Sequence, residues 1–196
     1  QLVQAYATQF PDAAKGVILD GVVDLNLSAE QFYRRYTLAA EALLAETFAL
    51  CTTLPACHAD IPDGAAQVYD DLAARVAQSP VPVTYTLADG TQVQRLLTTG
   101  LLEANAFYAL YSPEGRAEFL RALAAAGRDN LVPLLQLGYA NMYIDPETEI
   151  GMKDPGWFGA AYYAITCTDY GSGTGTPDER ARRILDEARE LGPEAP

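Results

Sequence analysis

The side chains in this chain that could attack a carbonyl carbon are a few serines and cysteines, with one histidine to act as a base. The serines are Ser28, Ser79, Ser112 and Ser172. A serine nucleophile on a strand-to-helix turn needs a small residue such as glycine two positions before and two positions after it, because the turn is tight. None of the serines has this surrounding; Ser172 comes nearest, but Tyr170 occupies the first glycine position. The sequence therefore predicts no serine nucleophile among these residues.

A catalytic triad also needs a histidine base, and His58 is the histidine of this chain. It lies between Cys57 and the turn-forming sequence Ala-Asp-Ile-Pro, with no serine near it along the chain. We expect it to be a solvated loop residue. A cysteine nucleophile would need a lowered thiol pKa and a positioned base, and we expect neither at Cys51, Cys57 or Cys167.

The cysteine spacing allows a disulfide but not a metal site. Cys51 and Cys57 are separated by Thr-Thr-Leu-Pro-Ala, a link that can turn. A bridge between them would stabilise the fold by about 2 kcal/mol in the chain-entropy model; two reduced, partly buried thiols are the alternative. With one histidine, the two cysteines fall short of the four ligands of a zinc site, so we expect no metal and no other cofactor. Cys167 is left as a free thiol or as half of a pair whose partner lies elsewhere.

Composition excludes several classes of partner. A chain of 196 residues that is 49% hydrophobic is long and apolar enough for a core. Its net charge of −13 and isoelectric point near 4.3 argue against nucleic acid or an anionic membrane as partner. No run of about 18 apolar residues predicts a transmembrane helix, and no basic region followed by an apolar stretch at the start predicts a signal peptide.

The beginning of the chain looks like part of a larger fold. Leu2 and Tyr6 fall at helical spacing, and Pro11 ends the pattern. Residues 16–20 (Gly-Val-Ile-Leu-Asp) then form a short apolar run, which is typical of a strand buried on both faces. Such a strand needs neighbours, and the sequence offers no second run of this kind. Because an unpaired strand edge recruits other chains, we expect intermolecular strand pairing or a swapped dimer through residues 1–24.

The rest of the chain carries helical patterns, which predicts a mainly α fold with one β-hairpin. Capping boxes at Ser28 and Thr176 begin helices, and Asp-Gly between two alternating runs predicts the hairpin at residues 81–96. Further helices are predicted at residues 62–79, 97–111, 113–127, 131–143 and 157–166. The last of these is apolar on almost every side, so it should be the most buried helix. Residues 145–155 are expected to form a mobile loop.

The sequence of residues 1–24, QLVQAYATQFPDAAKGVILDGVVD, resembles the segment that follows the nucleophile in serine-dependent α/β-hydrolases of the tripeptidyl aminopeptidase and proline iminopeptidase branch. There a Gly-x-Ser-Tyr-Gly turn leads into a helix ending in YA…FPD and a strand ending in LDGVVD. The resemblance implies that the reactive serine lies a few residues before Gln1 and that residues 1–24 are a remnant of the α/β-hydrolase core. Residues 25–196 would be the helical cap, or lid, which the family inserts before its late strands.

The resemblance also implies a function, a serine peptidase that releases residues or short peptides from a free amino terminus. The chain itself would be inactive without the missing hydrolase core, but would cover the active site and help to bind the peptide substrate. A buried ammonium group needs a paired anion. Asp169, which follows the apolar helix at 157–166, is the first candidate for this anion. Glu103 is the second, because it lies beside the expected apolar stripe of Leu97, Leu101, Ala104, Tyr108 and Tyr111.

The same resemblance bears on the cysteines and on location. The C-x5-C segment ending in Pro-Ala-Cys is similar to a disulfide loop in the cap of secreted tripeptidyl aminopeptidases, which implies a Cys51–Cys57 bridge and a secreted protein. In that family the cysteine corresponding to Cys167 pairs with one further along the chain. Two other functions stay open at this point: a self-standing helical binding domain without catalysis, and an unrelated enzyme whose clustered acids would need a metal.

Overall fold

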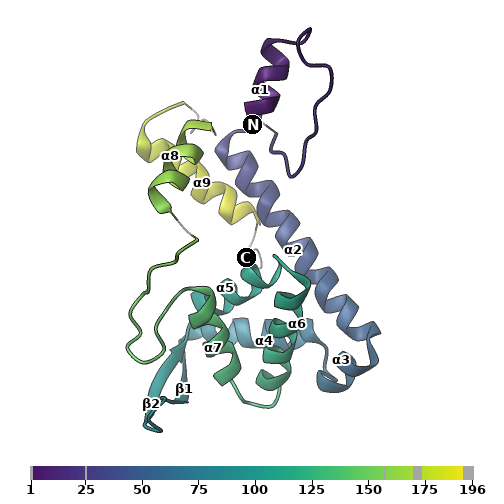
Figure 1. Ribbon diagram of the computed structural model, residues 1–196. Helices are drawn as coiled ribbons and strands as arrows, with labels where there is room; N and C mark the ends of the chain where they lie inside the picture. Colours follow the sequence, from purple (N-terminus) through teal and green to yellow (C-terminus); the bar gives the residue numbers. More distant parts are fainter. Residues whose placement is uncertain (1, 25, 157, 170–173, 192–196) are drawn as a thin grey trace. The chain divides into compact units, whose positions relative to one another are not determined.

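The computed structural model describes the chain except for residues 1, 25, 157, 170–173 and 192–196, and describes residues 167–169 by their backbone alone. The described part is mainly helical with one two-stranded antiparallel hairpin, as the sequence predicts (Figure 1). It divides into two compact units, unit 1 from residues 1–35 and 158–193 and unit 2 from residues 36–157. The predicted division at residue 24 concerns the origin of the segments and stays a prediction.

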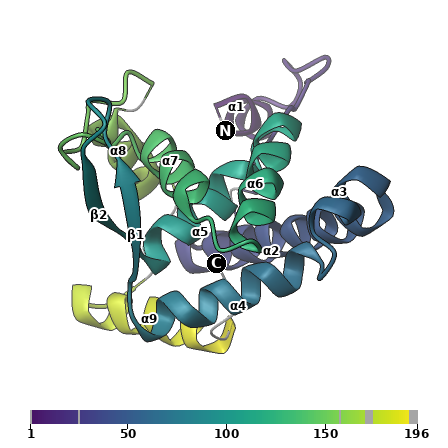
Figure 2. The ribbon, with the colours of Figure 1, turned by 90° about the horizontal axis from the view of Figure 1, so that it is seen from below.

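Unit 2 is a helical domain with the hairpin at one end. Its elements are the later part of α2 (Ala29–Thr53), α3 (Pro55–Asp60), α4 (Ala65–Gln78), β1 (Val81–Thr86), β2 (Gln92–Leu97), α5 (Thr99–Ala109), α6 (Pro113–Ala126) and α7 (Val132–Asn141). Helices α5, α6 and α7 pack on one another, α4 packs on α6, and α7 lies next to β1 (Figure 2). Unit 2 therefore has the arrangement of a small independent domain.

Local sequence accounts for where these elements begin and turn. The Thr98 hydroxyl accepts the Leu101 N–H at the start of α5, at 3.2 Å. Ser112 does the same for Gly115 at the start of α6, at 2.9 Å. In the hairpin turn, Gly90 has a φ of +86°, a left-handed conformation that glycine adopts without strain. The strands pair antiparallel from Val81↔Leu97 to Thr86↔Gln92.

Among the residues that the structure describes, the buried core lies wholly within unit 2. Its largest fully buried side chains are Phe119, Leu97, Leu102, Leu123, Leu134, Leu135, Asn105 and Cys51. An aromatic cluster of Phe48, Tyr69 and Phe119 links α2, α4 and α6, with ring centroids 5.6–6.4 Å apart. Gly138 allows α7 to approach α5, since a Cβ there would lie 2.9 Å from the Leu101 side chain. Burial of these apolar side chains is the main stabilising contribution to the unit.

Helix α5 buries a different face from the predicted stripe. Tyr108 and Tyr111 are 43% and 68% exposed, and Asn105 and Ala106 are buried instead. The full set of buried residues in α5 is Leu102, Asn105, Ala106 and Ala109, and this helix packs against α6 and α7. The predicted stripe is wrong at Tyr108 and Tyr111, whereas Leu97 is buried at the end of β2 and Leu101 packs against the core. Because α5 is apolar on more than one side, periodicity cannot select the buried one.

The segment after α7 is fastened to the hairpin, although the sequence predicted a mobile loop. Ile144 and Gly151 form an antiparallel bridge. Arg95 of β2 donates to the carbonyl oxygens of Pro146 and Glu147, each at 3.0 Å. Prolines and glycine in the sequence indicated the turn but not the arginine that holds it.

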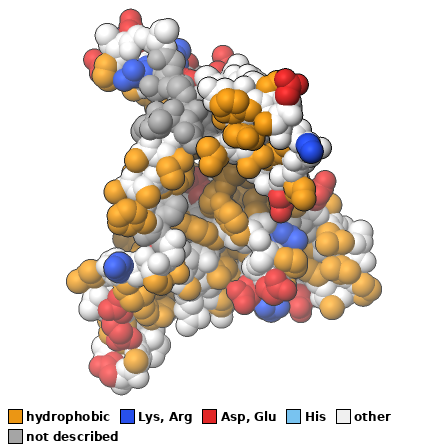
Figure 3. Space-filling model, turned by 45° about the horizontal axis from the view of Figure 1, so that its top comes forward, with side chains coloured by type: hydrophobic (Ala, Val, Ile, Leu, Met, Phe, Trp, Pro, Cys, Tyr) orange, Lys and Arg blue, Asp and Glu red, His pale blue; other side chains and the backbone are white. Residues whose placement is uncertain are grey.

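Unit 1 contains α1 (Leu2–Gln9), the start of α2, α8 (Gly159–Asp169) and α9 (Pro177–Leu191), and none of its described residues is buried. The prediction that residues 157–166 form the most buried helix was wrong: Tyr163 is 65% and Ile165 56% exposed in α8. A helix that is apolar all round needs partners on every side, and the described part of unit 1 does not supply them. Figure 3 shows many hydrophobic side chains on the drawn surface of the protein.

The predicted strand at residues 16–20 is not formed in the chain by itself. These residues have no regular secondary structure, and Ile18 is 94% exposed. Without a neighbouring strand a segment cannot satisfy its peptide groups by ladder hydrogen bonds, so the apolar pattern alone did not produce the predicted buried strand. The preceding helix, α1, agrees with the prediction for the first ten residues.

Candidate acidic pocket

The two carboxylates predicted to bind substrate fall in different units. Asp169 is the last residue of α8, and its side chain lies outside the described residues. Glu103 is exposed on α5 in unit 2. Its charge adds to burial in raising the pKa of Tyr69 to about 12, with a further contribution from Asp70. Glu103 therefore lies close enough to the half-buried Tyr69 to affect its pKa. It does not line the acidic pocket of unit 1.

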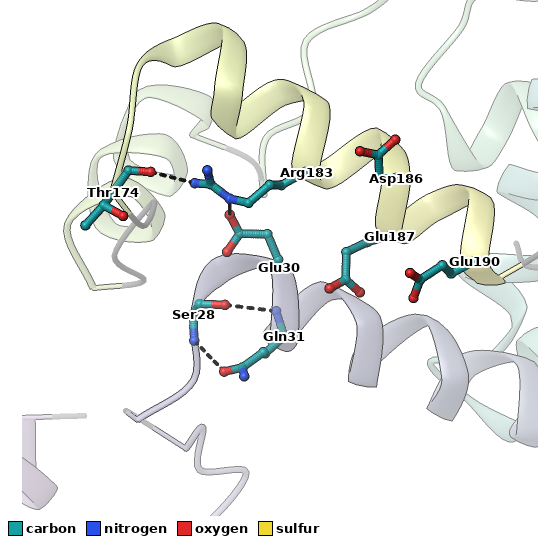
Figure 4. A pocket seen from close by; sticks show the side chains of 8 residues that line it. All are labelled: Ser28, Glu30, Gln31, Thr174, Arg183, Asp186, Glu187 and Glu190. Carbon is teal, nitrogen blue, oxygen red and sulfur yellow. Dashed lines mark hydrogen bonds and ion pairs between the residues drawn. The ribbon is translucent and has the colours of Figure 1, made fainter.

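A pocket does exist in unit 1, between the start of α2 and helix α9 (Figure 4). Its volume is about 500 Å³. The residues that line it are Ser28, Glu30, Gln31, Thr174, Arg183, Asp186, Glu187 and Glu190. Every one of them is polar or charged, so the pocket is suited to a polar or ionic ligand rather than to an apolar one.

Two capping boxes start the helices that form this pocket. The Gln31 N–H donates to the Ser28 hydroxyl at 3.2 Å, and the Ser28 N–H donates to the Gln31 side chain at 3.1 Å. Thr176 and Glu179 form the same pair of bonds at the start of α9, at 2.7 and 3.3 Å. Both boxes were predicted, and they fix the ends of the helices that carry the acidic residues.

Glu30 and Arg183 form the inner ion pair of the pocket, 3.7 Å apart. The Glu30 side chain is only 10% exposed. Hydrogen bonding from its own backbone lowers the pKa of Glu30; burial opposes this, and the Ser28 hydroxyl and Arg183 assist it. Arg183 also donates to the carbonyl oxygen of Thr174, at 2.9 Å. Glu30 is therefore an ionised group with a defined partner.

The other acids of the pocket are also paired in part. Arg34 of α2 lies 3.4 Å from Glu187 and 3.7 Å from Glu190, and Arg189 lies 2.8 Å from Asp186. The four lining carboxylates thus share three arginine partners. Carboxylates that outnumber their paired arginines are groups that can bind an ammonium ion.

No described group in unit 1 or unit 2 has the geometry of a nucleophile and its base. Ser28 and Ser112 use their hydroxyls as helix caps. His58 is exposed, and it lies on the short helix α3 rather than in the predicted loop. Within the described ranges it makes no side-chain hydrogen bond to a serine. Ser172, the nearest match to a nucleophile turn, lies outside the described residues.

The predicted Cys51–Cys57 disulfide is confirmed, with the two Cα atoms 5.2 Å apart. It joins the end of α2 to α3, and Cys51 is fully buried. The side chain of Cys167 lies outside the described residues.

Among the residues that the structure describes, no group of three or more His, Cys, Asp or Glu side chains could hold a metal ion. No helix in those same residues is long and apolar enough to cross a membrane.

Sequence reasoning missed the acidic pocket, although it found the caps that start its helices. The ion pairs between α2 and α9 join residues about 150 positions apart, and a single sequence carries no signal for such a pairing. The alternation of acids and arginines along α9 was the available clue.

No protein-family model matches the chain, and no curated protein is significantly similar to it.

Proposed function

We propose that this chain is the cap of an α/β-hydrolase-type serine peptidase that acts on free amino termini. In this role it covers the active site and helps to bind the peptide, while a hydrolase core supplies the nucleophile, the base and the orienting acid. The helical fold with one hairpin and the Cys51–Cys57 bridge support the proposal, because both were expected for such a cap.

The observation that carries the proposal is the exposure of the segment that resembles a hydrolase core. Leu2, Phe10 and Ile18 are 84%, 49% and 94% exposed. Leaving such side chains in water forgoes about 25 cal/mol per Å² of apolar surface. In the resembled fold this segment is a helix and a central strand, covered on both sides. A hydrolase core is therefore the partner whose shape and chemistry fit these residues.

The acidic pocket of unit 1 supports a role in binding the amino terminus of a peptide. Its four lining carboxylates suit an ammonium group, which needs an anion once it loses water. Thr174 lines the pocket and follows Asp169 by five residues, so the first predicted candidate belongs to the same part of the sequence. Glu103 keeps the role of a second candidate.

The disulfide bears on location. Disulfides persist in oxidising compartments and are rare in reducing ones. The bridge at Cys51–Cys57 is consistent with an extracellular protein, and we propose that the protein is secreted.

Two measurements on the purified chain test the proposed function. Aminoacyl and tripeptidyl p-nitroanilides should not be hydrolysed. In titration calorimetry, a tripeptide amide with a free amino group should bind more tightly than its N-acetylated counterpart. Glu187→Gln should reduce that difference, and Glu118→Gln, an exposed acid on α6, should leave it unchanged. Hydrolysis by the chain, or equal binding of the two peptides, would contradict the proposal.

A self-standing binding domain is the second candidate, and one observation favours it. The buried core of the described residues lies in unit 2, which favours folding of this unit without a partner. Residues 36–157, expressed alone, should then unfold cooperatively on heating. This result would support the independent folding of unit 2. Labelling of the native protein with a fluorophosphonate that reacts with catalytic serines then distinguishes a peptidase cap from a binding domain.

A further inference from the structure

We propose that helix α9 is a salt-sensitive gate of the acidic pocket, held against the start of α2 by ion pairs and released from it when salt screens them. The inference concerns one wall of the pocket, and it does not depend on the proposed peptidase function. It follows from three features of α9: the direction of its apolar stripe, the exposure of its ion pairs and its share of the pocket lining.

The apolar stripe of α9 faces solvent. Its apolar residues recur at the spacing of one helix face, at Ala181, Ile184, Leu185 and Ala188. All of these are exposed, Ile184 by 52% and Leu185 by 54%. Arg180 and Glu187, on the charged side of the helix, are half-buried instead. A helix packed through its apolar side has the opposite arrangement, so burial of apolar surface contributes little to holding α9 in place.

Ion pairs join α9 to α2. The Arg34 guanidinium lies 3.4 Å from the Glu187 carboxylate and 3.7 Å from the Glu190 carboxylate, and Arg183 lies 3.7 Å from Glu30. Figure 4 shows Glu187 and Glu190 pointing from α9 toward α2. The side chains of Arg34, Glu187 and Glu190 are 39%, 38% and 73% exposed. Pairs that are open to water in this way contribute about 1 kcal/mol or less each, and salt weakens them.

The pocket depends on this contact because α9 forms one side of it. The start of α2 supplies Glu30 and Gln31, and the lining residues from α9 are Arg183, Asp186, Glu187 and Glu190. When α9 moves away from α2, these two sets separate and the pocket opens to solvent. Ionic strength therefore controls the fraction of molecules in which the pocket is closed.

Hydrogen exchange of the full chain, followed by mass spectrometry, tests the gate. It is measured at about 0.1 M and about 1 M salt, between which the screening length falls from about 10 Å to about 3 Å. The amides of α9 should exchange about fivefold faster at the higher salt, because a helix of 15 residues is only marginally stable without a partner. The amides of α6 should not accelerate, since its buried side chains belong to the core of unit 2.

Variants of Arg34 test the contact from the α2 side. Arg34→Glu places a carboxylate opposite Glu187 and Glu190, so α9 should exchange about fivefold faster at the lower salt. Added salt should then slow its exchange, because it screens a repulsion. Arg34→Lys keeps the charge and should stay within about twofold of the parent. Arg35→Glu is the matched control: Arg35 pairs with Asp24, at 3.9 Å, and the change should leave α9 unaffected.

The reversed salt effect in Arg34→Glu separates docking of α9 from the stability of the helix itself. Salt also weakens ion pairs within α9, such as Arg189–Asp186, but this effect has the same sign in the parent and in the variant. The proposal would be overturned by exchange of α9 that does not respond to salt, by acceleration with salt in Arg34→Glu as well, or by an equal effect of Arg35→Glu.

Discussion

Arg95 and Glu149 form an ion pair 2.8 Å long between strand β2 and the turn that follows α7. The arginine side chain is 12% exposed, and the Tyr139 hydroxyl donates to the second oxygen of the same carboxylate at 2.8 Å. Glu149 has a φ of +56°, a conformation that costs free energy for a residue with a side chain. The two hydrogen-bond donors hold it there. This network keeps residues 145–149 against the hairpin.

Arg95→Met should release that turn. The change keeps the apolar stem but removes the ion pair and the bonds to two carbonyl oxygens, so we expect a loss of about 2 kcal/mol in the free energy of unfolding. Hydrogen exchange of the amides of residues 145–150 should accelerate as well. Arg121→Met, at an exposed position on α6, is the control and should change neither quantity. Equal effects of the two substitutions would contradict the role of the network.

Asn105→Ala should destabilise unit 2 by about 2 kcal/mol. The Asn105 side chain is fully buried and donates to the Leu134 carbonyl oxygen at 2.8 Å, and it accepts from the Asn141 side chain at 3.3 Å. Without it, the Leu134 carbonyl oxygen loses a buried donor and the half-buried Asn141 side chain loses its acceptor. Asn105→Asp should cost more, because it buries a charge. Urea denaturation measures both; a neutral Asn105→Ala would show that water replaces the amide. Gln67→Ala on the exposed face of α4 is the control.

Reduction of the Cys51–Cys57 bridge should lower the stability of unit 2 by about 2 kcal/mol, because a small covalent loop constrains the unfolded chain. The midpoint of denaturation should therefore fall when dithiothreitol is added. The double variant Cys51→Ala, Cys57→Ala should have the lower midpoint with or without the reductant. Sensitivity of this double variant to dithiothreitol would assign the effect to another group.

High pH should destabilise the fold through two tyrosines. Burial raises the pKa of Tyr139 to about 12, with further contributions from the hydrogen bond and charge of Glu149, and the pKa of Tyr69 is also raised to about 12. In the unfolded chain a tyrosine ionises near pH 10. The fold therefore keeps this stability below pH 10 and loses it as the pH rises from about 10 to about 12. Tyr69→Phe should flatten the decline in melting temperature over that window; an unchanged slope would contradict the assignment.

The sequence predicted those parts of the fold that depend on contacts between residues close together along the chain. The capping pairs Ser28–Gln31 and Thr176–Glu179, the Asp89–Gly90 turn and the short cysteine loop all follow from residues close together in sequence. Contacts between residues far apart in the sequence were not predicted. The buried face of α5 depends on Asn105 meeting Leu134, and the candidate pocket depends on Glu30 meeting Arg183. Neither contact can be inferred from a single sequence.

The misjudged elements share one physical cause. Residues 16–20 and helix α8 were expected to be buried because they are apolar. Burial requires a partner surface as well as an apolar side chain. The described part of unit 1 offers little surface of this kind. The same excess of exposed apolar surface is what connects the fold to a proposed hydrolase core.

Labelling of the native protein is the most direct test of the cap assignment. The protein is tagged in its source organism, treated with a fluorophosphonate that reacts with catalytic serines, isolated and mapped by mass spectrometry. We predict that a serine in a Gly-x-Ser-Tyr-Gly sequence carries the label and that this serine lies outside the 196 residues described above. Label on Ser28, Ser79, Ser112 or Ser172, or a native polypeptide that binds no label, would contradict the account.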